Sequence, residues 1–120
     1  MSPARKAILK RPDEFQRCYR QGKVYKNRVA VLHVYHRGDD EPARVGFSVS
    51  KKVGKAVERN RVKRWLRAVV MPLAPALPRG YDLVFSARTR AKFEGYWPLK
   101  HGVYELLKQG ELLPKEADPN

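Results

Sequence analysis

Residues Val45 to Val70 read VGFSVSKKVGKAVERNRVKRWLRAVV, and this stretch decides the fold. Val45, Phe47 and Val49 alternate with small residues, which is the period of a half-buried β-strand whose second face carries only small side chains. From Ala56 onward, apolar residues recur at helical spacing and predict a helix that packs on a sheet. That apolar stripe consists of Val62, Trp65, Leu66, Val69 and Val70.

The predicted helix also carries a cationic face. At about 100° per residue, its polar side chains gather opposite the apolar stripe. This face comprises Asn60, Lys63, Arg64 and Arg67, with Arg59 and Arg61 on its flanks. Between Lys51 and Arg67 the sole acid is Glu58, although exposed helix faces ordinarily mix both signs because like charges one turn apart repel. The pattern favours contact with a polyanion over the alternative of a merely solvated face.

Length and charge narrow the class of protein further. A chain of 120 residues fits one domain, and a formal net charge of +14 favours a nucleic acid partner, bound with a steep dependence on salt. We expect no membrane association, because the sequence has neither an apolar run near 20 residues nor a basic amphipathic terminal helix. The single cysteine, Cys18, excludes an internal disulfide and a zinc site built from cysteine pairs. The N-terminal residues lack a secretory signal pattern, so we expect a cytoplasmic protein.

The remaining elements can be placed by their patterns. Pro12 and two acids begin a helix that ends near Gly22, and a strand follows from about Arg28 to His36. We expect this strand to form a hairpin with the strand at residues 45–49. Residues 81–87 form another strand, and leucines from about Pro98 predict a closing helix. We expect residues 1–10 to form a flexible basic arm, 11–113 a single RNA-binding domain and 114–120 a disordered tail.

Three rings have two interpretations. Phe15 and Tyr19 are four residues apart on one helix face, and His33 lies on the strand that follows. They can be ordinary core residues, or they can border a groove in which aromatic faces stack unpaired bases. We do not assign His33 as a catalytic base.

The sequence favours binding over catalysis. The acids lie mainly at a helix start, in a turn at residues 39–41 and near the C-terminus, so they predict no carboxylate pair for a metal-dependent nuclease. His33 and His36 fall on opposite faces of their strand, and Gly54-Lys55 lacks the rest of a phosphate-binding loop. We therefore expect no catalytic and no metal-binding residues in the protein.

The stretch from Phe47 to Arg64, FSVSKKVGKAVERNRVKR, resembles the signature of the bacterial ribonuclease P protein subunit, including its Arg-Asn-Arg motif at residues 59–61. The resemblance extends from Leu9 and Phe15 into the last helix. It implies an α+β sandwich in the order α-β-β-β-α-β-α, similar to the second domain of a small-subunit ribosomal protein. It also implies one strand beyond the three found from the pattern, and a left-handed βαβ crossover around the basic helix, against general statistics.

The resemblance also implies a function. In that family a catalytic RNA cleaves precursor tRNA to remove its 5′ leader, using Mg²⁺ held mainly by RNA, and the protein assists. The implied RNA-subunit surface comprises Arg59, Asn60, Arg61, Lys63, Arg64 and Arg67. The implied surface for the single-stranded leader comprises Phe15, Tyr19, His33, Lys51, Lys52, Arg88 and Arg90. His33 stands where tyrosine is common in the family, which departs from the family's pattern.

Two other functions compete with this one. A stand-alone ribosomal-type RNA-binding module or RNA chaperone would show much the same charge and α/β pattern. A protein-only nuclease is disfavoured because the sequence offers no carboxylate or histidine constellation for it. We expect the protein alone to be a monomer.

Overall fold

The computed structural model describes residues 7–119. Its four strands form one sheet in the order β1-β2-β4-β3. The elements are α2 (Pro12–Gln21), β1 (Lys23–Lys26), β2 (Ala30–His36), β3 (Arg44–Ser48), the 3₁₀ turn η1 (Lys51–Val53), α3 (Ala56–Val70), the 3₁₀ turn η2 (Met71–Ala76), β4 (Tyr81–Ala87), α4 (Arg90–Glu94) and α5 (Tyr96–Gln109). The architecture is the α+β sandwich expected from the sequence, with the short helix α4 added before the last helix.

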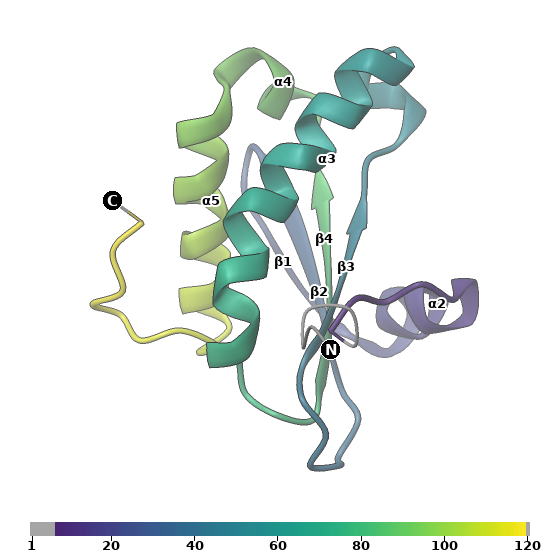
Figure 1. Cartoon of the computed structure of the whole chain (residues 1–120), viewed down its shortest axis with the longest axis vertical. Coiled ribbons are helices and arrows are strands. Elements are labelled where there is room, and N and C mark those ends of the chain that lie inside the picture. Colours follow the sequence, from purple (N-terminus) through teal and green to yellow (C-terminus); the bar gives the residue numbers. More distant parts are fainter. Residues whose placement is uncertain (1–6, 120) are drawn as a thin grey trace.

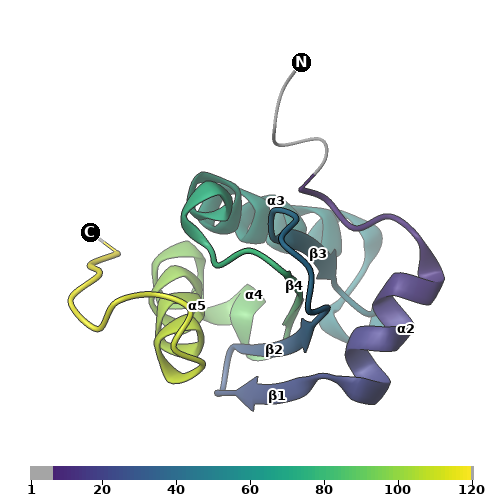
Figure 2. The ribbon, with the colours of Figure 1, turned by 90° about the horizontal axis from the view of Figure 1, so that it is seen from below.

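The helices lie on both faces of the sheet. Helices α3 and α5 cover one face, and α2 packs against the other (Figure 1, Figure 2). The main core lies between the sheet and the α3/α5 pair, where Leu32, Phe85, Leu66 and Leu106 are fully buried. A smaller cluster lies under α2 around Cys18 and Val84. Because α2 is held by so few apolar contacts, polar contacts have more influence on its position.

The strand pairing differs from the sequence-based expectation. The expected hairpin between β2 and β3 is wrong, since β4 lies between them and pairs antiparallel with β2 and parallel with β3. The hairpin is instead β1 with β2, and β1 is the additional strand that the family resemblance implied. The run Leu83, Val84 and Phe85 is buried on both faces, which suits a central strand better than an edge strand.

The connection from β3 through α3 to β4 is left-handed. In Figure 1 both strands point upward, α3 lies in front of the sheet and β4 lies to the left of β3. Crossovers of this kind are right-handed in about 98% of cases. As a result, α3, which carries the cationic face, packs against the parallel pair β3/β4 and lies beside α5.

Local chemistry explains where the helices begin. The Glu58 carboxylate accepts a hydrogen bond from the Lys55 backbone N–H at 3.0 Å, and Glu14 does the same for Arg11 at 3.2 Å. Each carboxylate also lies in the first turn of its helix, where the helix dipole favours negative charge. Within α5, Gly102 permits close packing, since a Cβ there would lie 2.4 Å from a methyl carbon of Val29.

The ordered domain extends beyond the expected boundaries. Of the expected flexible arm, residues 1–6 lie outside the described residues, but Ala7 and Leu9 are buried and Leu9 donates its N–H to the Val45 carbonyl at 2.7 Å. In the expected disordered tail, Ala117 packs against the main core. Apolar side chains near each end of the described residues thus pack on the domain.

Candidate nucleic-acid interface

The cationic face of α3 points away from the core. Asn60, Lys63, Arg64 and Arg67 are exposed, and Arg59 and Arg61 are half-buried at its flanks. The predicted apolar stripe is confirmed on the opposite side, where Val62, Leu66, Val69 and Val70 are buried. The helix therefore presents a row of cations on a rigid element.

The arginines of this face are partly ordered by neighbouring rings. The Arg61 guanidinium carbon lies 5.3 Å from the Trp65 ring centre, and that of Arg67 lies 5.8 Å from the Phe47 ring centre. The Nε atoms of Arg59 and Arg61 are buried and have no hydrogen-bond partner among the described residues. Arginine forks pair with phosphate in two-pronged geometry, so preordered guanidinium groups are well suited to an RNA backbone.

The acid within this stretch does not neutralise the arginines. Glu58 is occupied by the Lys55 backbone N–H and by the Lys92 ammonium, which lies 3.3 Å away. These hydrogen bonds, from Lys55 first and Lys92 second, hold the pKa of Glu58 below its ordinary value. The α3 surface keeps its excess of positive charge.

The structure brings together the three predicted rings on the α2 side of the sheet. The ring centres of Phe15 and Tyr19 are 6.4 Å apart, and Tyr19 meets His33 edge-to-face at 4.9 Å. Phe15 lies against the backbone of Gly46, where a Cβ would be 2.6 Å from its ring. All three rings remain half-buried, so each keeps some surface open to solvent.

His33 has the properties of an aromatic wall. Burial lowers the pKa of its imidazole below the ordinary value, which favours the neutral ring near neutral pH. Its Nδ1 atom is buried and lacks a hydrogen-bond partner among the described residues. A neutral ring in edge contact with Tyr19 can stack or line a surface.

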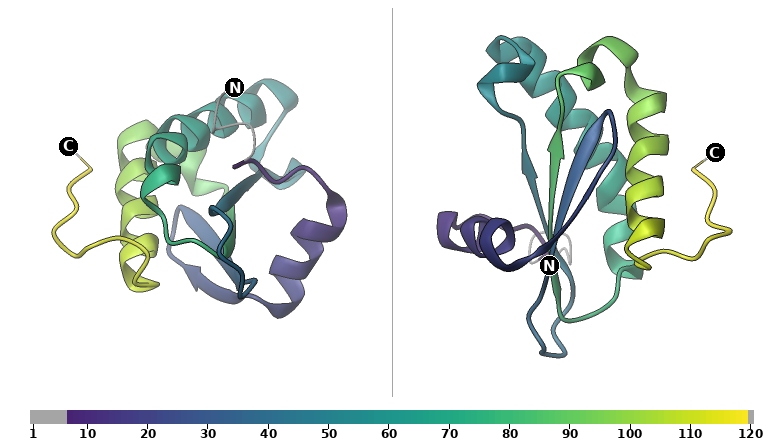
Figure 3. Two further views of the ribbon diagram at one scale, coloured as in Figure 1. Left: turned by 60° about the horizontal axis from the view of Figure 1, so that its bottom comes forward. Right: turned by 180° about the vertical axis from the view of Figure 1, so that it is seen from behind.

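Small residues extend this surface along the sheet. Strand pairing places Val31, Ser86 and Ser48 in one row across β2, β4 and β3, on the face that bears His33 and Gly46. All three are half-buried. Seen from behind, α2 crosses only the lower part of the sheet (Figure 3, right). None of these residues was predicted as part of the site, although the small residues that alternate along β3 were a signal for Ser48.

The predicted leader-binding cations lie at the far end of this row. The segment 88–90 meets η1 through a hydrogen bond from the Thr89 hydroxyl to the Lys52 carbonyl at 3.4 Å. The four cations of these two segments, Lys51, Lys52, Arg88 and Arg90, are all exposed. Ser86 is two residues from Arg88 along β4 and pairs with Ser48 near the start of η1. The rings of Phe15, Tyr19 and His33 thus lie at one end of a strip of the sheet, and these four cations lie at the other end. We call the three rings, the row of Val31, Ser86 and Ser48, and the four cations together the α2-side strip.

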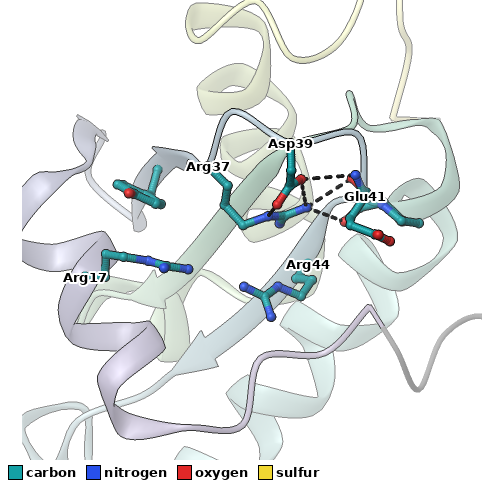
Figure 4. A pocket seen from close by; sticks show the side chains of 7 residues that line it. Arg17, Arg37, Asp39, Glu41 and Arg44 are labelled. Carbon is teal, nitrogen blue, oxygen red and sulfur yellow. Dashed lines mark hydrogen bonds and ion pairs between the residues drawn. The ribbon is translucent and has the colours of Figure 1, made fainter.

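An acid that the sequence analysis passed over anchors α2 to the sheet. Asp82 of β4 is fully buried and accepts hydrogen bonds from Arg17, Arg37 and Arg44, which come from three different segments. These arginines line a hollow of about 550 Å³ beside the loop between β2 and β3. In Figure 4 Arg17 and Arg44 point toward each other across it, while Arg37 is held by Asp39.

Electrostatics keeps this carboxylate ionised. Burial alone would raise the pKa of Asp82, but the hydrogen bonds from its arginines outweigh burial and lower the pKa below the ordinary value. Cys18 lies nearby, and burial raises the pKa of its thiol to about 11. Cys18 is therefore a packed thiol rather than a nucleophile.

Residues 7–119 also show whether a metal site or a membrane-spanning helix is present. No three side chains of the histidine, cysteine, aspartate and glutamate type converge so as to hold a metal ion. Within the same residues no helix has the length and apolar character needed to cross a lipid bilayer.

Comparison with known proteins identifies related chains. A family model described as Ribonuclease P matches residues 4–110. The ribonuclease P protein component of Symbiobacterium thermophilum is 43% identical over 103 residues, covering 86% of this chain and 90% of that protein. The corresponding component of Caldanaerobacter subterraneus is 42% identical over 104 residues, covering 87% of this chain and 89% of that protein.

Solved structures agree with these relatives. The RNase P protein of Staphylococcus aureus superposes with a TM-score of 0.82 at 29% identity, covering 90% of this chain and 98% of that chain. The RNase P protein of Thermotoga maritima gives a TM-score of 0.73 at 29% identity, covering 85% of this chain and 96% of that chain. Sequence and fold therefore point to the same relatives.

Proposed function

The chain belongs to the ribonuclease P protein family, and from this premise we propose how its surfaces serve the enzyme. It is a protein subunit of the ribonucleoprotein endoribonuclease that matures the 5′ end of tRNA. Cleavage is carried out by the catalytic RNA, and Mg²⁺ held mainly by that RNA would supply the activated water. The protein binds that RNA and the 5′ leader of precursor tRNA.

The cationic face of α3 is the surface for the RNA subunit. The observation that carries this assignment is the row of exposed cations on a helix whose one acid is already paired with Lys92. A rigid row of guanidinium groups binds phosphates and releases condensed counterions, which gives high affinity and a steep salt dependence. Arg59, Asn60, Arg61, Lys63, Arg64 and Arg67 form this surface.

The α2-side strip is the surface for the single-stranded leader. Phe15, Tyr19 and His33 supply ring faces at one end, and exposed cations lie at the other. Small side chains between them leave room for an unpaired strand to lie against the sheet. Stacking and charge together bind single strands with little preference for sequence, which suits leaders of varied sequence.

The experiment compares three tubes in which 5′ cleavage of a precursor tRNA is followed at low Mg²⁺. One contains the protein, one the catalytic RNA and one both. We expect strong stimulation only in the mixture. Cleavage by protein alone would make the protein itself the nuclease, and no effect in any tube would favour the less supported alternative, a ribosomal-type RNA-binding module or chaperone.

Two further properties complete the proposal. We infer a cytoplasmic location, which is where precursor tRNA is made in bacteria, and a monomeric protein in the absence of RNA. Sedimentation of the protein with and without the catalytic RNA checks the second property, and a protein that is dimeric alone would contradict it.

A further inference from the structure

Two large rings are exposed where α4 meets α5. Phe93 is 76% exposed and Trp97 is 57% exposed. Gly95, between them, adopts a φ of +96°, which turns the chain sharply from one helix into the next. Neither ring is needed to fill the core, because Leu99, Val103 and Leu106 supply the buried face of α5.

Each ring is accompanied by a cation. The Lys92 ammonium lies 5.0 Å from the Phe93 ring centre, and the Lys100 ammonium lies 5.2 Å from the Trp97 ring centre. An exposed ring offers a π-face to a base, and Lys100 beside Trp97 also offers a charge to an adjoining phosphate, whereas the Lys92 ammonium is paired with Glu58. We call Lys92, Phe93, Trp97 and Lys100 the α4/α5 patch.

The patch adjoins the start of α3. Lys92 reaches across to Glu58 of α3 at 3.3 Å, so the first turn of the cationic helix and the patch are linked. Figure 1 shows α4, the start of α5 and the start of α3 at the same end of the molecule. The patch therefore continues the surface assigned above to the RNA subunit.

We propose that Phe93 and Trp97 stack on unpaired bases of the catalytic RNA, extending its contact from α3 onto the corner between α4 and α5. The inference rests on the proposed function of α3. Charge favours RNA over a protein partner, because Lys100 lies beside Trp97 in a chain of net charge +14. The link to α3 favours the catalytic RNA over the leader, because the rings assigned to the leader lie on the other face of the sheet.

Binding of catalytic RNA to single variants tests the stacking. We expect Phe93→Ala and Trp97→Ala each to lower affinity roughly tenfold, in line with the loss of one base stack. Phe93→Leu keeps apolar area without a π-face and should behave like Phe93→Ala, while Trp97→Phe should retain much of the affinity. Val57→Ala is the matched control, since Val57 is an apolar side chain that is 78% exposed at the same end and has no ring.

Fluorescence gives a direct readout of contact. The chain has two tryptophans, so Trp65→Phe leaves Trp97 as the sole reporter. We expect titration with catalytic RNA to quench its emission, and titration with leader-bearing precursor alone to quench it less. Quenching by precursor alone and not by catalytic RNA would overturn the assignment, because the bases would then belong to the substrate.

The failure of this inference can be separated from failure of the proposed function. If Arg61→Ala weakens RNA binding but all changes at Phe93 and Trp97 leave it unaltered, then α3 binds RNA and the patch does not. If Arg61→Ala also has no effect, the assignment of α3 fails first. If Phe93→Leu binds RNA like the unchanged protein while Phe93→Ala does not, the contact is apolar packing and stacking is excluded.

Discussion

Arg44 and Asp82 form a two-pronged ion pair inside the domain. The Arg44 Nε donates to Asp82 Oδ1 and its Nη2 donates to Oδ2, both at 2.9 Å. A third nitrogen, Nη1, donates to Glu14 of α2 at 2.7 Å. One arginine of β3 thus joins the central strand to the helix that carries Phe15 and Tyr19. The position of α2 over the sheet depends on this pair, because few apolar side chains lie under the helix.

Replacing Asp82 should loosen α2 as well as lower stability. Asp82→Asn removes the buried negative charge that the three arginines share, and breaking a buried ion pair on one side costs about 3–5 kcal/mol. We expect a loss of that size in urea unfolding and weaker binding of leader-bearing precursor at temperatures where the variant is folded. Affinity for the catalytic RNA should change little. Asp40→Asn, at an exposed turn position, is the control.

The free energy of unfolding should fall in acid, because the Asp82 carboxylate becomes protonated. The pKa of Asp82 is lower in the folded protein than its ordinary value of 3.8, so protons bind the unfolded chain more readily. Asp82 contributes its full stabilisation at pH values above 3.8, and this contribution is lost as the pH falls through the lowered pKa of Asp82 in the folded protein. Thermal unfolding between pH 6 and pH 2 should therefore show a steeper decline for the unchanged protein than for Asp82→Asn. Parallel curves would show that Asp82 does not contribute in this range.

Substitutions on the two surfaces should produce different defects. Arg61→Ala removes a guanidinium from α3 and should weaken assembly with the catalytic RNA, with a smaller dependence on salt. Phe15→Ala removes a ring from the α2-side strip and should lower affinity for leader-bearing precursor by ~1–3 kcal/mol per lost base stack. Precursor lacking a leader is the control substrate for Phe15→Ala. One shared defect for both variants would contradict the assignment of two surfaces.

The elements of this fold in which one hydrophobic periodicity dominates can be predicted from the sequence. The stripe of α3 and the alternation of β3 fix which faces are buried, and Glu58 and Pro12 mark helix starts. Strand pairing is different, because alternation shows which face of β2 is apolar and not which strand lies beside it. The insertion of β4 between β2 and β3 depends on tertiary packing of a largely buried strand, and the sequence pattern predicted a β2/β3 hairpin instead.

The candidate site likewise contains residues that the sequence predicts and residues that it does not. Cations and rings stand out in composition and spacing, so Arg61, Phe15 and Lys51 could be proposed from the chain alone. Asp82 could not, because it is a lone acid within an apolar strand, and its three arginine partners are distant in sequence. The row containing Ser48 and Ser86 likewise appears only once the register of β3 on β4 is known.

Gly46 should control the position of Phe15. A Cβ at residue 46 would lie 2.6 Å from the Phe15 ring and 3.2 Å from the Leu9 Cβ, so Gly46→Ala must push the ring away. We expect leader affinity to fall toward that of Phe15→Ala, with a cost in stability of about 1–3 kcal/mol. Ser48→Ala, on the same face of β3, controls for a change of strand surface.

A double-mutant cycle decides whether the methyl group acts through the ring. If it does, adding Gly46→Ala to Phe15→Ala lowers leader affinity no further, since the displaced group is already absent. The two losses then fail to add, although they come from different elements. Additive losses would mean that Gly46 contacts the leader itself or alters the strand, and that the close approach of ring and backbone does not set the geometry of the surface.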